Sequence, residues 1–211
     1  MSLGKEWKRY EELMLERPVE FQNDGEIRIV TDSRIVEEFE KKNGRKIGVV
    51  YESPYSIMLV DLVYETEGNY YAYERLIPAV EKGSVVVIPR YKDKFVLLRQ
   101  YRHSMRGYQY AFPRGYGEAG IRAEDNVKKE IGEELGACAS EIQYLGKVVA
   151  NSGISGERVS VYTCTLENYL EKTGYEGITE VVALEEKQME KWIHENKIDD
   201  GFTLAAYSLF R

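Results

Sequence analysis

The sequence predicts a mixed α/β protein in two regions, a strand-rich region from residue 1 to about 80 and a mixed strand and helix region from 81 to 211. Three observations lead to this prediction. Apolar and aromatic residues recur in strand-length runs between residues 27 and 77. A continuous apolar run at 84–89 indicates a buried strand, and residues 123–135 carry apolar side chains with the 3.6-residue period of a helix.

The N-terminal region begins with an expected surface helix at residues 5–16, where Trp7, Tyr10 and Leu13 recur at helical spacing between charged residues. Pro18 should end this helix, because proline cannot continue the backbone hydrogen-bond ladder. The other expected elements of this region are a short helix at 35–42, a hairpin turn at 65–69, and strands at 27–31, 46–51, 56–64 and 70–77.

The second region alternates strands with helices, which is typical of α/β domains. Apolar runs bounded by turn residues mark its strands, and the helical period marks its helices. The expected strands are 84–89, 95–100, 143–149, 157–166 and 180–184, and the expected helices are 123–135, 186–196 and one that begins at Thr203.

Composition and charge limit the classes of partner. The chain has 211 residues and a formal net charge of -7, which argues against nucleic-acid binding, because affinity for a phosphate backbone needs clustered cations. The longest run without Asp, Glu, Lys or Arg, residues 201–210, is far shorter than the roughly 18 residues of a membrane helix. We therefore expect no nucleic acid and no membrane as partner. Anionic small molecules remain possible substrates if a cation neutralises them.

The two cysteines indicate the redox environment. Cys138 and Cys164 could form one bridge at most, whereas small secreted folds use several. The segment around Trp7 carries charged residues and lacks the continuous apolar stretch of a secretory signal. We therefore expect a cytoplasmic protein whose two thiols are reduced and pack inside the fold.

The helix expected at 123–135 carries acidic side chains beside its apolar face. At about 100° per residue, Val127, Ile131 and Leu135 form one apolar stripe, and Glu130 and Glu134 lie along its edge. These two carboxylates are one turn apart and repel each other. A cation between them would reverse that penalty, and Mg²⁺ prefers such hard oxygen ligands.

A solvated acidic helix face is the alternative interpretation, because runs of charge usually just face water. Lys128 and Lys129 support it, since each follows an acidic residue by four positions, as in surface ion pairs. Glu133 lies further from the apolar stripe than Glu130 and Glu134 do. Glu130 and Glu134, however, lie beside that stripe, and a helix face that is only solvated does not require acids there.

A glycine-rich loop precedes this helix, with Gly115, Gly117 and Gly120 in six residues. Such glycines allow left-handed turns and a close approach of the backbone to phosphate oxygens. Their spacing also matches the G-x-G-x-x-G pattern of nicotinamide-dinucleotide enzymes. That pattern should follow a continuous apolar strand, and residues 108–114 do not form one, so the dehydrogenase hypothesis is weak. A connector without any ligand is the other alternative.

The segment from Gly115 to Ala137 resembles the Nudix box, whose pattern is G-x5-E-x7-R-E-U-x-E-E-x-G-U with U aliphatic. It departs from the pattern twice, since Ile121 replaces the first glutamate and Lys129 replaces the arginine. In the family these two positions commonly pair and brace the loop on the helix. The positions that agree with the pattern are Gly115, Glu130, Ile131, Glu133, Glu134 and Gly136.

The resemblance implies a Nudix-type α/β/α sandwich with a mixed sheet, and a hydrolase that uses Mg²⁺, with Mn²⁺ as a substitute. It implies Glu130 and Glu134 as principal metal ligands and the Arg114 carbonyl as a further one. Glu133 would be an additional ligand or a base acting through water. Gly115 would lie against the substrate phosphates.

Residues 99–103, Arg-Gln-Tyr-Arg-His, resemble a segment of ADP-ribose pyrophosphatases and related nucleotide-sugar hydrolases. Residues 198–206 resemble the entry to their C-terminal helix. This likeness implies a pyrophosphatase acting on ADP-ribose or a nucleotide sugar, and a homodimer joined through the N-terminal region. Arg102 is the candidate phosphate contact, because a planar guanidinium matches phosphate oxygens. Arg114 is a second substrate-binding candidate, and Glu176, in a later loop, is the candidate general base.

Two further alternatives remain open at the level of sequence. Residues 112–115, Phe-Pro-Arg-Gly, also resemble hydrolases of dinucleoside polyphosphates, so the substrate is open within the family. The replacements at Ile121 and Lys129 leave room for a protein of the same fold that binds a nucleotide without cleaving it. This second alternative is a nucleotide sensor with little or no catalysis.

Overall fold

The computed structural model describes residues 3–65, 69–171 and 174–211. They form two compact units: unit 1 comprises the chain up to residue 79 together with 151–156, and unit 2 comprises 80–150 and 157–211. The sequence assigns 151–156 to the second region, but the amide of Leu76 donates to the carbonyl of Ile154 at 2.7 Å. Part of the hairpin turn expected at 65–69 lies outside the described residues.

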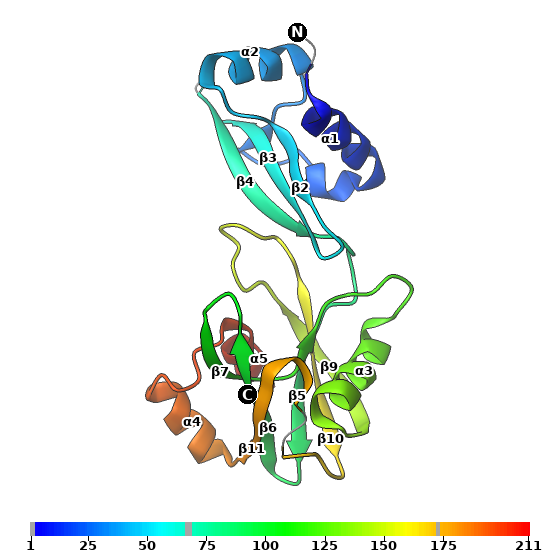
Figure 1. The fold of residues 1–211 in the computed structure, drawn as a ribbon, viewed down its shortest axis with the longest axis vertical. Coiled ribbons are helices and arrows are strands. Elements are labelled where there is room, and N and C mark those ends of the chain that lie inside the picture. Colours follow the sequence, from blue (N-terminus) through cyan, green and yellow to red (C-terminus); the bar gives the residue numbers. More distant parts are fainter. Residues whose placement is uncertain (1–2, 66–68, 172–173) are drawn as a thin grey trace. The chain divides into compact units, whose positions relative to one another are not determined.

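Unit 1 packs two helices against a four-stranded antiparallel sheet (Figure 1). Strand β3 pairs with β4 along its whole length and with β2 and β1 over shorter stretches. Trp7, Tyr10 and Leu13, the three residues at helical spacing, are all buried in the core of this unit. The elements are α1 (Lys5–Glu16), a 3-10 turn η1 (Pro18–Phe21), β1 (Arg28–Ile29), α2 (Ser33–Asn43), β2 (Gly48–Glu52), β3 (Ser56–Tyr64) and β4 (Tyr70–Pro78).

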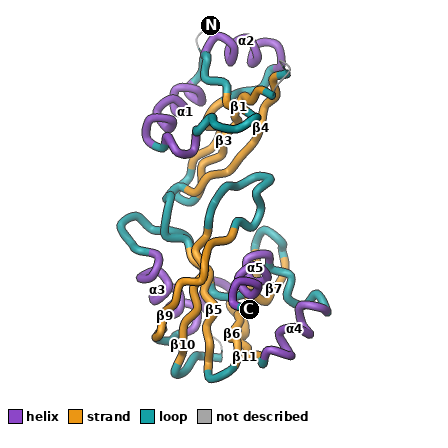
Figure 2. Tube along the Cα trace, turned by 180° about the vertical axis from the view of Figure 1, so that it is seen from behind, coloured by secondary structure: helices purple, strands orange, loops and turns teal. Residues whose placement is uncertain are grey.

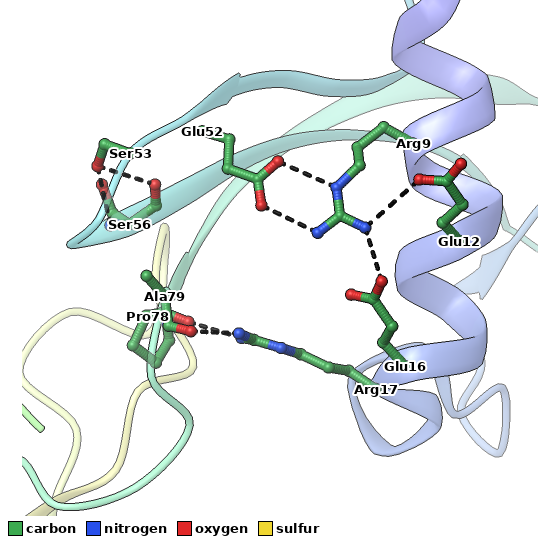
Figure 3. A network of polar contacts seen from close by, with 9 residues as sticks. All are labelled: Arg9, Glu12, Glu16, Arg17, Glu52, Ser53, Ser56, Pro78 and Ala79. Atoms are coloured by element: carbon green, nitrogen blue, oxygen red, sulfur yellow. Dashed lines mark hydrogen bonds and ion pairs between the residues drawn. The ribbon is translucent and has the colours of Figure 1, made fainter. Parts of the chain in front are cut away.

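Arg9 on α1 and Arg17, which follows the last residue of α1, attach this helix to the sheet (Figure 3). Arg9 donates to both carboxylate oxygens of Glu52 on β2, at 3.0 and 2.9 Å, and to Glu16 at 3.0 Å. Arg17 donates to the carbonyl of Pro78 at 2.7 Å and also to that of Ala79. Exposed ion pairs of this kind contribute about 1 kcal/mol or less, so burial of the apolar face of α1 provides most of the stabilisation.

Unit 2 contains a seven-stranded mixed sheet in the order β11-β6-β5-β10-β9, to which β7 is added beside β6 and β8 beside β5. Strands β5 and β10 are parallel, and the other pairs are antiparallel. The strands are β5 (Val85–Tyr91), β6 (Lys94–Arg102), β7 (Gly107–Ala111), β8 (Arg114–Gly115), β9 (Ala139–Val148), β10 (Val159–Leu166) and β11 (Ile178–Leu184). The helical elements are α3 (Ala123–Leu135), the 3-10 turn η2 (Tyr175–Gly177), α4 (Glu186–His194) and α5 (Gly201–Phe210).

Helices cover both faces of this sheet. Because side chains alternate along a strand, Val85 and Val87 of β5 pack with α3, whereas Val86 and Ile88 pack with α4 and α5. Figures 1 and 2, seen from opposite sides, both show α3 and α5 on opposite sides of the strands. The arrangement is an α/β/α sandwich with a mixed sheet, as predicted.

The expected strands and helices are present, with small differences at their ends. Helix α3 begins and ends at the predicted residues, and Gly136 follows it with φ 60°, a left-handed C-cap that favours glycine. Strands β7 and β8 were not predicted, because β7 mixes polar and aromatic residues and β8 is only two residues long. No helix among the described residues is long and apolar enough to cross a membrane.

The two cysteines differ in their surroundings. Both are free thiols, and Cys164 on β10 is buried in the core, as expected. Cys138 is exposed, so the expectation that it packs inside the fold is wrong. It lies between the buried Ala137 and the first residue of β9, where alternate side chains point outward.

Candidate active site

Helix α3 buries two of its acidic side chains. Glu130 is 8% exposed and Glu134 is 2% exposed, and both lie beside the apolar stripe that packs on the sheet. Plain solvation of an acidic helix face would leave these carboxylates in water. The alternative interpretation of a solvated face therefore does not apply to this pair.

Burial makes both carboxylates difficult to ionise. It raises the pKa of Glu130 to about 7, a value that the charge of Lys129 moderates. Burial and the neighbouring Glu130 raise the pKa of Glu134 to about 8. The amide of Arg114 donates to Glu134 Oε2 at 3.2 Å, and within the described part of the chain no side chain donates to either carboxylate. Neither carboxylate therefore forms an ion pair within the described residues.

The glycines of the preceding loop are required by contacts with other segments. A Cβ atom at Gly115 would overlap the carboxylate of Glu130, and one at Gly117 would overlap the carbonyl of Lys82. Gly120 adopts φ 80°, which side chains disfavour. The carboxylate of Glu130 thus lies directly against the backbone at Gly115, where the box pattern begins.

Lys129 braces this loop on the helix through a partner that the sequence did not indicate. Its ammonium group forms an ion pair with Glu118 of the loop and lies 3.5 Å from Glu133 Oε2. The i,i+4 pair with Asp125 suggested by the sequence is not formed, because Asp125 pairs with Arg122 at 2.8 Å. The box pattern has a glutamate at position 121, where this chain has Ile121. Glu118, three residues earlier, supplies the carboxylate that pairs with Lys129.

Hydrogen bonds to the backbone hold the same loop from its other side. Asn126, fully buried on α3, donates from Nδ2 to the carbonyls of Gly83 and Tyr116, both at 2.9 Å. The amide of Gly117 donates to Ser84 Oγ at 3.1 Å. The loop is therefore attached both to the helix and to the start of β5.

Two arginines lie near the buried carboxylates. Arg102 ends β6, and its half-buried guanidinium has a pKa lowered by burial and by the neighbouring charge of Arg114. Its Nε and NH2 atoms are buried and have no hydrogen-bond partner among the described residues. Buried donors of this kind are normally satisfied, so they suit an anion that the protein itself does not supply.

Arg114 is oriented by the start of the last helix. Its NH1 atom donates to Asp200 Oδ1 at 3.0 Å, and Asp200 caps α5 by accepting from the amide of Thr203 at 2.9 Å. The hydroxyl of Thr203 in turn accepts from the amide of Phe112 at 2.9 Å. The cap pattern Asp-x-x-Thr indicates where the helix begins. Nothing in the sequence indicates Arg114 as the partner of Asp200.

The turn η2 brings two further candidates to this place. Glu176 is the middle residue of this turn and is exposed, and its charge contributes to the raised pKa of both Glu130 and Glu134. Glu133, which is partly exposed, accepts a hydrogen bond from the hydroxyl of Tyr175 at 3.2 Å. The residues that the sequence singled out, from β6, β8, α3 and η2, therefore gather at one site.

The side chains present fit a magnesium ion that completes its coordination with other ligands. Two buried carboxylates without a cation, beside a backbone that approaches closely at Gly115, form a site that a divalent cation would stabilise. Among the described residues no three acidic, histidine or cysteine side chains converge to hold a metal by themselves. Mg²⁺ often uses only one or two carboxylates and takes water and phosphate oxygens in addition.

Comparison with solved structures shows the class of fold. The chain is similar to the crystal structure of an ADP compounds hydrolase, with a TM-score of 0.65 and 17% sequence identity over 77% of this chain and 88% of that chain. At this identity the likeness concerns the fold. The fold is the mixed α/β fold of the Nudix hydrolases, as the box pattern predicted.

Comparison with curated proteins adds a more particular relationship. The chain is 27% identical over 94 residues to the ADP compounds hydrolase NudE of Escherichia coli K12. The match covers 44% of this chain and half the length of that relative. No family model matches the chain. The chain is thus a distant relative of the Nudix hydrolase NudE.

Proposed function

We propose that this protein hydrolyses the pyrophosphate bond of a nucleoside diphosphate linked to another group, with ADP-ribose or a nucleotide sugar as substrate. The products are a nucleoside monophosphate and a phosphorylated remainder. One observation carries the proposal: two buried carboxylates that form no ion pair among the described residues lie near two arginines, and the buried donors of Arg102 have no partner there. The similarity to an ADP compounds hydrolase agrees with such a substrate.

Each residue of the site has a role that its position supports. Glu130 and Glu134, with the Arg114 carbonyl, would hold Mg²⁺, or Mn²⁺ in its place. When bound, the ion supplies charge neutralisation of the diphosphate and activation of the attacking water. Arg102 binds a phosphate oxygen through its open donors. Gly115 was expected to lie against the phosphates, but the space beside its backbone holds the Glu130 carboxylate, so its role is to admit that metal ligand.

The remaining acidic residues act on the proton of the attacking water. Glu176 lies on η2, the turn that Tyr175 ties to α3, and is the proposed general base. Glu133, whose Oε2 accepts from Tyr175 and lies near Lys129, would act as a base through a second water. The expectation that it is also a metal ligand has no support from the geometry, because no three acidic side chains converge among the described residues. The homodimer and the cytoplasmic location expected from the sequence stay predictions.

The sensor alternative rests on the two departures from the box pattern. It requires that the loop lose its attachment to the helix when Ile121 and Lys129 replace the family residues. Lys129 keeps an ion pair with the loop through Glu118, and this observation favours the hydrolase. The two functions differ in one outcome, which is whether bound nucleotide is cleaved.

A substrate panel with and without EDTA tests the proposal. ADP-ribose, nucleotide sugars, dinucleoside polyphosphates and nucleoside triphosphates are incubated with the protein and Mg²⁺ or Mn²⁺, and products are separated by chromatography. We expect cleavage of ADP-ribose or a nucleotide sugar that EDTA abolishes. Tight binding by calorimetry without any product would overturn the hydrolase and support the sensor.

A further inference from the structure

The turn that carries Glu176 has an unfavourable backbone conformation. Glu176 adopts φ 43° and ψ 36°, a left-handed conformation that residues other than glycine rarely adopt. The flanking Gly174 and Gly177 also have positive φ, at 71° and 78°, but as glycines they tolerate it. A strained residue persists only where its surroundings hold it, so something must fix the backbone at Glu176.

Gln100 provides that contact. It lies on β6, is 3% exposed, and donates from Nε2 to the carbonyl of Glu176 at 3.1 Å. Ladder pairing between β6 and β11 is irregular between Ile178 and Glu180, next to this turn. The neighbouring Tyr101 packs against the same turn. A Cβ atom at Gly177 would lie 3.4 Å from the Cβ atom of Tyr101.

The side-chain amide of Gln100 lowers the stability of the fold through its oxygen. Its Oε1 atom is buried and has no hydrogen-bond partner among the described residues. An apolar side chain of similar length would avoid burying that oxygen, and residues 95–98 before it on β6 are all buried apolar residues. The use of the amide at this position is therefore explained by its donor, which is engaged by the carbonyl of Glu176.

We infer that Gln100 is a positioning residue, which holds the backbone of Glu176 left-handed and so sets where its carboxylate lies beside α3. The same turn is attached to α3, because the hydroxyl of Tyr175 donates to Glu133 at 3.2 Å. The inference rests on the proposed function for the role of Glu176. Gln100 itself acts only through Glu176 and touches neither substrate nor metal in this scheme.

A double-mutant cycle tests the inference. Gln100→Met keeps the length of the side chain and removes the donor, and we expect kcat to fall about tenfold with KM within about twofold. In the Glu176→Gln background the same change should cost less than about twofold, because the residue it positions no longer acts as a base. An equal loss of kcat in both backgrounds would mean that Gln100 is merely structural and would overturn the inference.

Gln109→Met is the matched control. Gln109 is a buried glutamine on the neighbouring strand β7, and its amide donates to Asp199 at 2.8 Å instead of to the turn. Whatever this change costs, it should cost the same with and without Glu176→Gln. If Gln100→Met prevents folding, Gln100→Asn is used in the same cycle, since it keeps an amide but is one methylene too short to reach the carbonyl.

A measurement without substrate separates this inference from the proposed function. The amide of Ile178 donates to the carbonyl of Tyr175 and so reports on the turn. Its hydrogen exchange should accelerate about tenfold in Gln100→Met and stay unchanged in Gln109→Met. If the wild-type protein cleaves nothing, the proposed function fails while this result still stands. Unchanged exchange in Gln100→Met would overturn the positioning role.

Discussion

Each unit of this protein buries a carboxylate, and the two carboxylates differ in whether the protein pairs them with a cation. Asp61 in unit 1 and Glu134 in unit 2 are both 2% exposed. Asp61 accepts hydrogen bonds from the Tyr10 hydroxyl and from the guanidinium of Arg75, with which it forms an ion pair. Glu134 accepts from one backbone amide and lies near a second carboxylate, Glu130.

The difference teaches that burial alone does not identify a functional acid. A buried charge paired within the protein is part of the fold, and removing one partner leaves the other uncompensated. A buried charge left without a cation costs stability, and such a cost is typically found at functional sites. The following predictions test this distinction between Asp61 and Glu134, in order of decreasing effect.

Glu134→Gln should lower kcat by about 1000-fold while leaving the fold intact. The amide keeps the shape of the side chain and an oxygen that can accept from Arg114, but it lacks the charge needed to hold the metal. Steady-state hydrolysis of the best substrate in the panel measures the loss, and circular dichroism checks the fold. Turnover close to wild type would contradict the assignment of Glu134 as a metal ligand.

Asp61→Asn should do the reverse, lowering the free energy of unfolding by roughly 3 to 5 kcal/mol, because Arg75 loses its buried partner. The kcat of the folded protein should stay within about twofold of wild type, since substitutions outside a site act mainly on stability. Urea denaturation gives the first quantity, and assays under native conditions give the second. A loss of kcat without a loss of stability would show that unit 1 takes part in catalysis.

The stability of the metal-free protein should fall as the pH rises from about 5 to about 8. The pKa values of Glu130 and Glu134 are raised on folding from 4.5 to about 7 and about 8, so the folded protein binds these protons more tightly than the unfolded chain. This contribution favours folding fully below pH 4.5 and is lost as the pH passes the folded pKa values.

Denaturation in EDTA at several pH values measures this loss, and Mg²⁺ should diminish it by neutralising the two carboxylates. The matched variant, Glu130→Gln with Glu134→Gln, should flatten the pH dependence, whereas Asp61→Asn should not. If the double variant keeps the wild-type slope, other groups cause it, and the two glutamates are not the uncompensated charges of unit 2.

The ion pair between Lys129 and Glu118 should have the smallest effect. Lys129→Gln and Glu118→Gln should each lower kcat about fivefold, and the double variant should lose no more than either, because both remove the same attachment of the loop. Lys128→Gln is the control, because Lys128 lies on the same helix and its ion pair among the described residues is with Asp125. If Lys129 acts only through its charge near the carboxylates, Glu118→Gln will be silent, which would contradict the brace.

The sequence alone determined what depends on neighbours along the chain. The helical period fixed α3 from Ala123 to Leu135 and placed Glu130 and Glu134 at the edge of its apolar stripe. Gly115 could be singled out from the spacing of the box. These features are local, because the geometry of a helix sets which side chains share a face regardless of what the helix packs against.

Only the tertiary structure decided which distant segments meet. Gln100 and Glu176 are 76 residues apart, and Arg114 and Asp200 are 86 residues apart. Strand pairing and layer packing set these contacts, and no window of sequence contains both partners. The same holds for the segment 151–156, which joins unit 1 although the chain around it belongs to unit 2. Several acidic residues near Lys129 in the sequence could form an ion pair with it. The path of the folded loop determines that Glu118 does so.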